Sequence, residues 1–143
     1  MVRFKDFRDI PAWQLAHEMH LRVDVFLGCP EFRSHFKFCE QLREAARSGP
    51  RCIAEGHARR RPAEFATLVR AARGSEEQVL NHLIAAHGQA LITNDELDIN
   101  RWLTTRAMKA ASGLIQSLCR DVGDVVIDVP EENGVAACVG KIG

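Results

Sequence analysis

The sequence predicts an all-α protein, an antiparallel up-down-up-down four-helix bundle with a kinked second helix and a flexible C-terminal tail. Four long segments carry apolar residues at a spacing of three or four, which is the period of a helix with one buried face. Short connections join these segments, as in antiparallel bundles. The composition agrees, because the chain contains no tyrosine and is rich in alanine, leucine, arginine and glutamate.

Length and composition fit a single domain. The chain has 143 residues, of which 46% are hydrophobic and 27% are charged, and this is enough to bury one core. We expect residues 1–120 to form the bundle. We expect residues 121–143 to form a mobile tail, because they show no helical period, and a short strand over residues 125–129 is the alternative.

The first helix is predicted to begin at Pro11, with Asp9 as its N-terminal cap, and to end within residues 28–30. One apolar stripe faces the core and consists of Trp13, Ala16, His20, Val23 and Leu27. A second apolar row consists of Leu15, Met19 and Phe26. Two rows on one helix indicate that it also contacts a partner subunit.

The second helix is predicted to start within residues 31–34 and to end at Gly56. Pro50 lies inside it, and proline removes one backbone donor and clashes with the preceding turn. We therefore expect a kink near residues 46–49. Two helices separated at residues 48–50 are the alternative, but the apolar stripe keeps its phase across the proline and favours one kinked helix.

Residues 57–61 are predicted to connect the second helix to a third helix that starts at Pro62 and is about 28 residues long. Both helices have alanine, glycine or serine where leucine is usual, which favours a close approach. Folding at this connection places Ala45 and Ala46 opposite residues 72–75, and Gly74 is expected to allow the contact. A capping box at residues 93–96 then begins a fourth helix that ends at about Arg120.

Five segments resemble, in order and spacing, a known family of bacterial proteins. They are FRDIPAWQLA at 7–16, QLREAARSGPRCIAEG at 41–56, RRRPAEF at 59–65, ARGSEEQVLNHL at 72–83 and GLIQSL at 113–118. Together they resemble the four-helix-bundle proteins first named for open reading frames in 23S rRNA intervening sequences. The similarity covers about residues 4–120.

The resemblance implies a homopentamer of short antiparallel bundles with no established enzymatic activity. Relatives among diversity-generating retroelements are basic accessory proteins that bind a reverse transcriptase and nucleic acid. The chain departs from the family pattern at four positions. Cys52 replaces an asparagine, Arg61 a serine, Gln78 a glutamate, and Glu76 an apolar residue.

The net charge is zero, but the middle of the chain is basic. Residues 42–73 carry eight arginines against three glutamates, whereas residues 74–100 carry five acidic residues and neither lysine nor arginine. Arg43, Arg47 and Arg51 are spaced to lie along one face of the second helix, and the connection adds Arg59, Arg60 and Arg61. These six arginines are candidates for contact with RNA or DNA phosphates.

The alternative is a solvated face neutralised by glutamates, and two observations favour it: the zero net charge and the absence of aromatic residues interleaved with the arginines in the sequence. The acids proposed for this role are Glu44, Glu55, Glu76 and Glu77.

Four polar residues near the contact between the second and third helices are expected to be structural, namely Gln41, Glu55, Ser75 and Gln78. Glu55 is expected to pair with Arg70 or Arg73 across that contact, or to cap a backbone amide.

No catalytic residues, metal ligands or cofactor site are predicted. The chain has no Gly-rich phosphate loop and no Ser/His/Asp order. Four histidines lie on helices, but no Glu-x-x-His pair accompanies them, as a di-iron bundle requires. The five cysteines form no CxxC pair and are expected to be reduced thiols.

The sequence therefore predicts a non-enzymatic protein, and the family resemblance implies that it is an oligomer. No signal peptide and no apolar run of about 20 residues is present, so a cytoplasmic location without membrane contact is expected. The expected partners are further copies of the chain, RNA or DNA, and a reverse-transcriptase-like protein. The alternative is an interaction scaffold that binds another protein and no nucleic acid.

Overall fold

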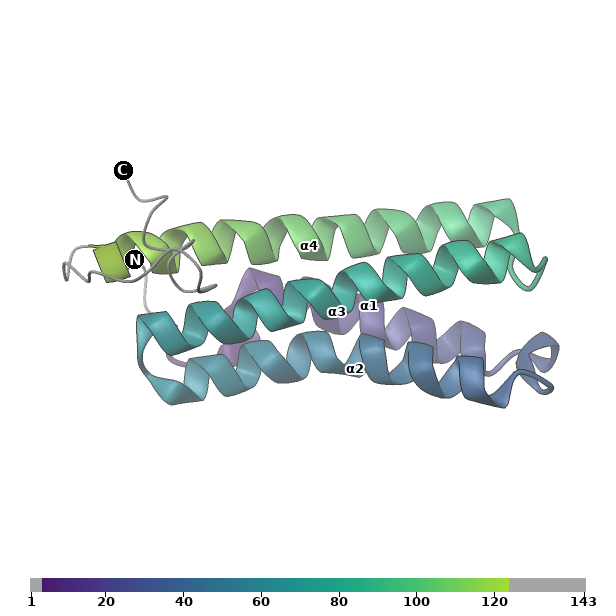
Figure 1. The fold of residues 1–143 in the computed structure, drawn as a ribbon, viewed down its shortest axis with the longest axis horizontal. Helices are drawn as coiled ribbons and strands as arrows, with labels where there is room; N and C mark the ends of the chain where they lie inside the picture. Colours follow the sequence, from purple (N-terminus) through teal and green to yellow (C-terminus); the bar gives the residue numbers. More distant parts are fainter. Residues whose placement is uncertain (1–3, 124–143) are drawn as a thin grey trace, which may run out of the picture.

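The computed structural model describes residues 4–123, and every regular element in that range is helical, which confirms the all-α prediction (Figure 1). Two short 3-10 turns accompany four long helices. The turns are η1 (Phe7–Asp9) and η2 (Pro30–Phe32), and the helices are α1 (Pro11–Leu27), α2 (Phe36–Arg59), α3 (Pro62–Gly88) and α4 (Asn94–Gly123).

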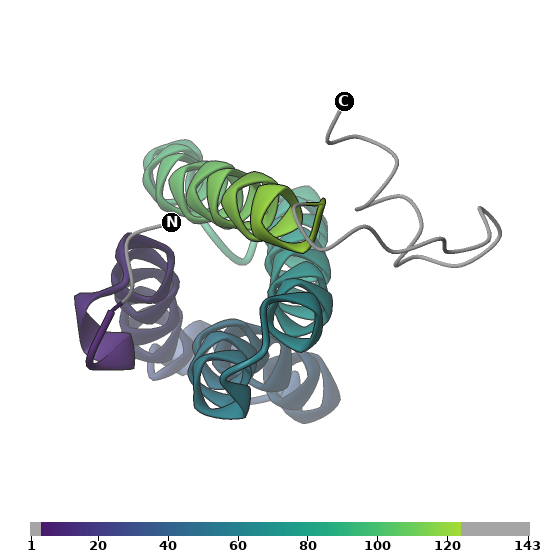
Figure 2. The same cartoon turned by 90° about the vertical axis from the view of Figure 1, so that its left-hand side faces the viewer.

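The four helices surround one core, and each helix packs against two others (Figure 2). α2 contacts α1 and α3, and α4 contacts α3 and α1, so the ring is closed. Along the α2–α3 contact, Phe38 meets His82 near one end and His57 meets Phe65 near the other. Residues late in α2 therefore lie beside residues early in α3.

The core is divided lengthwise into two apolar clusters. The cluster toward the α3–α4 connection includes Met19, Val23, Leu42, Val79, Leu83 and Leu103. The other, toward the α2–α3 connection, includes Ala16, Ile53, Phe65, Val69, Ala111 and Leu118. Burial of these side chains supplies the main stabilisation of the bundle.

Helix α1 has the predicted bounds but not the predicted surroundings. Ile10 is the N-terminal cap residue and makes no side-chain cap bond, while Asp9 belongs to η1, so the predicted Asp9 cap is wrong. Met19 and Phe26 of the second apolar row are buried in the protomer core. Leu15, the third residue of that row, is only half-buried, and the contact of this helix with a partner subunit stays a prediction.

Helix α2 is continuous through Pro50, as favoured over two separate helices. It starts later than predicted, because residues 30–32 form η2, and it ends three residues later, at Arg59. Only residues 60 and 61 remain to connect α2 to α3. Arg60 makes the turn in a left-handed conformation with φ of 63°, which costs a non-glycine residue some backbone strain.

The shorter connection shifts the register between α2 and α3 by about one turn. Ser75 lies opposite Ser48, instead of opposite Ala45 and Ala46 as predicted. Gly74 is exposed, and a Cβ atom added there would have no neighbour within 4 Å, so it does not allow a close contact. The close contact is at Gly56, where an added Cβ atom would lie 2.6 Å from the Phe65 ring.

Helix α4 begins at the predicted cap, because the Thr93 hydroxyl accepts a hydrogen bond from the Glu96 backbone N–H at 3.1 Å. It continues to Gly123, slightly beyond the expected end. The expected mobile tail and the alternative strand over residues 125–129 lie outside the described residues. No helix within residues 4–123 is long and apolar enough to cross a membrane.

Three of the cysteines within the described range, Cys29, Cys39 and Cys52, are free thiols, as expected. Cys119 is disulfide-bonded, so the expectation of reduced thiols is wrong for this residue.

Candidate nucleic-acid interface

The arginine stripe of α2 carries ion pairs at two of its three positions. The Arg43 Nε atom lies 3.7 Å from an Asp24 carboxylate oxygen of α1. The Arg51 guanidinium donates to the Glu44 carboxylate at 2.9 Å. Arg47 is exposed and forms no ion pair with any residue among 4–123.

The connection between α2 and α3 presents two more arginines without an acidic partner in the described part of the chain. Arg59 is bound to Glu55 at 2.7 Å, whereas Arg60 and Arg61 are exposed and unpaired there. A cavity of about 110 Å³ opens beside them, and its wall also includes the Phe4 and Phe65 rings. The fold thus places aromatic side chains next to arginines of the connection, although the sequence does not interleave them.

The neutralised-face interpretation is therefore correct for some of the stripe and connection. Glu44 and Glu55 pair with arginines, as that interpretation expects. Glu76 cannot neutralise this surface, because it is fully buried. Asp24, which sequence reasoning did not select, takes its place at Arg43.

The partner of Glu55 differs from the predicted one. It was expected to reach Arg70 or Arg73 across the helix contact, but its carboxylate binds Arg59 one turn later on the same helix. Arg59 was predicted to lie in the connection, but α2 continues to it, and so Arg59 lies on the helix four residues after Glu55. That spacing brings two side chains on a helix together.

A row of rings runs along α1, and its His20 end lies beside α2, because Asp24 contacts both His20 and Arg43. Trp13 and His17 are stacked, with ring centroids 4.6 Å apart and planes inclined by 13°. Phe7 meets the Trp13 ring edge-on at 5.2 Å, and His20 follows His17 at 6.1 Å. Both Trp13 and His17 are half-buried. The three- and four-residue spacing of positions 13, 17 and 20 is the signal that could have indicated this row. The apolar pattern of the sequence places Trp13 and His20 in the predicted core stripe instead.

His20 links the ring row to the arginine stripe. Its Nε2 atom lies 3.6 Å from an Asp24 carboxylate oxygen, and Asp24 in turn contacts Arg43. Burial lowers the pKa of the His20 imidazole, Asp24 opposes the shift, and the His17 and Arg47 charges add to it. Buried polar atoms without a hydrogen-bond partner within the described chain include His20 Nδ1 and Asp24 Oδ1.

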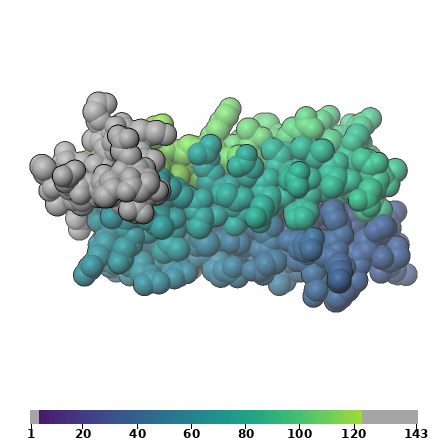
Figure 3. All heavy atoms as spheres, in the orientation of Figure 1, coloured from purple at the N-terminus to yellow at the C-terminus, as the bar shows by residue number. Residues whose placement is uncertain are grey.

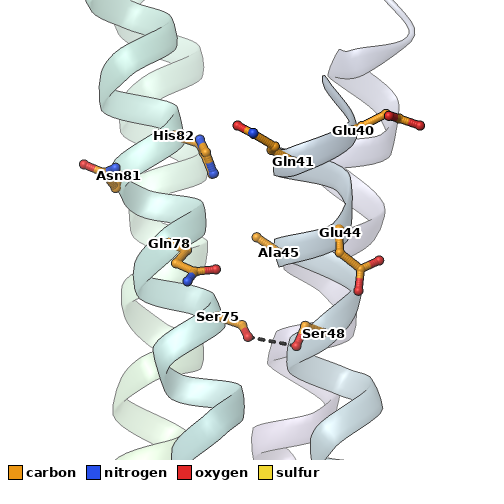
Figure 4. A pocket seen from close by; sticks show the side chains of 9 residues that line it. All are labelled: Glu40, Gln41, Glu44, Ala45, Ser48, Ser75, Gln78, Asn81 and His82. Atoms are coloured by element: carbon orange, nitrogen blue, oxygen red, sulfur yellow. Dashed lines mark hydrogen bonds between the residues drawn. The ribbon is translucent and has the colours of Figure 1, made fainter. Parts of the chain in front are cut away.

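The predicted polar residues Gln41, Ser75 and Gln78 line a hollow of about 560 Å³ between α2 and α3, whereas Glu55 does not (Figure 4). The Ser75 hydroxyl donates to Ser48 at 2.8 Å, which joins the two helices at one end of the hollow. The remaining polar lining residues are Glu40, Glu44, Asn81 and His82. Figure 3 shows the face of the molecule that α2 and α3 form.

Glu76 of α3 is the most unusual polar residue in the interior. Its side chain is fully buried, and neither carboxylate oxygen has a hydrogen-bond partner among the described residues. A Cβ atom added at Gly49 would lie 3.6 Å from one of these oxygens, so α2 leaves space beside the carboxyl group. Burial raises the pKa of Glu76 to about 8, against the smaller opposing effect of Arg73. The sequence indicates only that Glu76 stands where the family pattern has an apolar residue.

Within residues 4–123, no group of three or more histidine, cysteine, aspartate or glutamate side chains is arranged to hold a metal ion. A family model described as 23S rRNA-intervening sequence protein matches residues 8–113, which include α1, α2, α3 and much of α4. No curated protein matches the chain.

Proposed function

The chain belongs to the 23S rRNA-intervening sequence protein family, and on that premise we propose that it is a non-enzymatic, oligomeric accessory protein. In this proposal the protein contacts nucleic-acid phosphates through α2 and through the connection to α3. No cofactor takes part.

One observation carries the proposal: three exposed arginines, Arg47, Arg60 and Arg61, have no acidic partner among the described residues. An exposed guanidinium can hold two phosphate oxygens at once, and each phosphate contact releases counterions from the nucleic acid. An oligomer repeats these arginines in every subunit, so a protomer with zero net charge presents a multivalent basic surface.

The proposed protomer is an antiparallel up-down-up-down bundle with a bend near Pro50, and the proposed assembly is a cytoplasmic homopentamer. Short connections and the pairing of late α2 residues with early α3 residues support the antiparallel arrangement. Pro50 supports the bend, since it cannot donate to the carbonyl group of Ala46. The pentamer rests on the family resemblance.

The test combines mass with retention of nucleic acid. Light scattering on the full chain should give a mass of five protomers. Labelled RNA and DNA should be retained at low ionic strength and released as salt is added. An assembly that retains neither nucleic acid at low salt would contradict the proposed phosphate contact.

A protein-binding scaffold is the second candidate, and exposed apolar side chains favour it. Val25 is 70% exposed on α1, Trp102 is 59% exposed on α4, and these two helices are neighbours in the bundle. Leu21 and Ile99 add to the exposed apolar surface of the same helices. A reverse-transcriptase-like protein is the partner this candidate proposes. Co-purification with such a partner, without salt-sensitive retention of nucleic acid, would favour the scaffold.

A further inference from the structure

We propose that the nucleic acid is single-stranded and lies in the seam between α1 and α2, with bases stacked on rings of α1 and phosphates held by arginines of α2. The seam is defined by Trp13, His17 and His20 on α1 and by Arg43 and Arg47 on α2, and the arginine stripe continues from it to Arg51, which pairs with Glu44 on the same helix. This inference rests on the proposed function and specifies its ligand.

The rings of α1 form a partly stacked row. The Trp13 and His17 planes are within 13° of parallel at a centroid distance of 4.6 Å, which is the geometry of offset stacking. Phe7 contacts the Trp13 ring edge-on and so supports it from the N-terminal side. Because Trp13 and His17 are only half-buried, part of the row faces solvent, where a base can continue the stack.

Two arginines of α2 lie along the same seam. Arg43 lies 3.7 Å from Asp24 of α1, which also contacts His20 of the ring row, and Arg47 follows Arg43 one turn later on α2. Successive arginines of the stripe are one turn apart, about 6 Å along the helix axis. The seam therefore offers aromatic surface on one wall and a line of cations on the other, the combination used by proteins that bind single strands.

The ring row decides between a single strand and a duplex. Base pairing and stacking inside a duplex cover the base faces, so a duplex can offer this seam only its phosphates. A single strand can offer both. Two carboxylates oppose binding, since Asp24 and Glu44 already hold Arg43 and Arg51. A phosphate must displace Glu44 from Arg51, and therefore we expect Glu44→Gln to tighten binding.

The test uses the full chain with Trp102→Phe, which leaves Trp13 as the one fluorescent tryptophan. Trp102 lies exposed on α4, outside the seam, so its replacement preserves the proposed site. Three probes are titrated at low salt: oligothymidylate, an abasic strand of the same length, and a duplex. We expect oligothymidylate to quench Trp13 and to bind roughly five- to 150-fold tighter than the abasic strand, as stacking of one base implies.

His17→Ala should remove most of that preference and leave binding of the abasic strand unchanged, and His87→Ala, at the far end of α3, is the matched control. Equal, salt-sensitive binding of all three probes would overturn the stacking inference and leave the proposed phosphate contact intact. Binding of none would overturn both. The comparison of probes needs only the Trp102→Phe protein, in which the seam is unaltered, and so does not depend on the folding of a seam variant.

Discussion

Ionisation of Glu76 should make the stability of the bundle depend on pH. The carboxyl group is fully buried, and its pKa is about 8, against a value of 4.5 when unshifted. Between these values the unfolded chain releases the proton and the folded chain keeps it. The unfolded state then binds fewer protons, so the free energy of unfolding falls as pH rises.

The magnitude follows from the two pKa values. Below pH 4.5 the Glu76 carboxyl group is protonated in the folded and the unfolded chain, and it does not make stability depend on pH. Above pH 4.5 it lowers the free energy of unfolding by about 1.4 kcal/mol per pH unit. Between pH 5 and pH 7 the loss is about 2–3 kcal/mol, and above pH 8 it approaches about 5 kcal/mol. Replacement by leucine removes the buried polar group, and so Glu76→Leu should be more stable than the parent, most clearly at high pH.

The assay is urea unfolding of the parent and Glu76→Gln at pH 5, 6 and 7. Glutamine does not titrate, so the difference in the free energy of unfolding between the two proteins should change by about 2–3 kcal/mol over this range. Glu77→Gln is the matched control, because Glu77 is the adjacent residue and is exposed, and its pH profile should follow the parent. Identical pH slopes for the parent and Glu76→Gln would refute the reasoning.

Further substitutions test the close packing and the helix cap. Gly56→Ala should destabilise the fold by about 1–3 kcal/mol in urea unfolding, because its Cβ atom would lie 2.6 Å from the Phe65 ring. Gly74→Ala, with open space around it, should stabilise the fold by about 0.5–1 kcal/mol, and a loss there would contradict the assigned surroundings. Thr93→Ala should cost about 1 kcal/mol through loss of the bond to the Glu96 amide, and an unchanged midpoint would show that this cap contributes nothing.

The fold could be predicted from local physical signals. The three- and four-residue spacing of apolar side chains, Pro11 and Pro62 at helix starts, and the Thr93 cap each specify an element without reference to the rest of the chain. The register of α2 against α3 could not be predicted in the same way. It depends on whether the helix stops at Gly56 or continues, and the turn at Arg60 uses a left-handed conformation that is uncommon for arginine.

The candidate site was only partly predictable for a related reason. The arginine stripe and its partner Glu44 follow from spacing within one helix, but the other acidic partner, Asp24, and the neighbouring ring row come from α1. Asp24 reaches Arg43 of the stripe, and brings His20 with it, only because α1 packs against α2. The burial of Glu76 was hidden as well, since a glutamate beside Glu77 reads as part of a solvated pair until the packing is known.

Contact of nucleic-acid phosphates with the arginine stripe is the central claim, and the salt dependence of binding tests it most directly. The logarithm of the binding constant for oligothymidylate should fall linearly with the logarithm of salt concentration. Each phosphate contact on a single strand contributes about 0.7 to the magnitude of this slope. Arg47→Ala removes one such contact from each subunit, and so the magnitude should fall by about 0.7 for each subunit that binds the strand. Arg101→Ala, an exposed change on α4, should leave the slope unchanged. Equal slopes for the parent and Arg47→Ala would contradict the account.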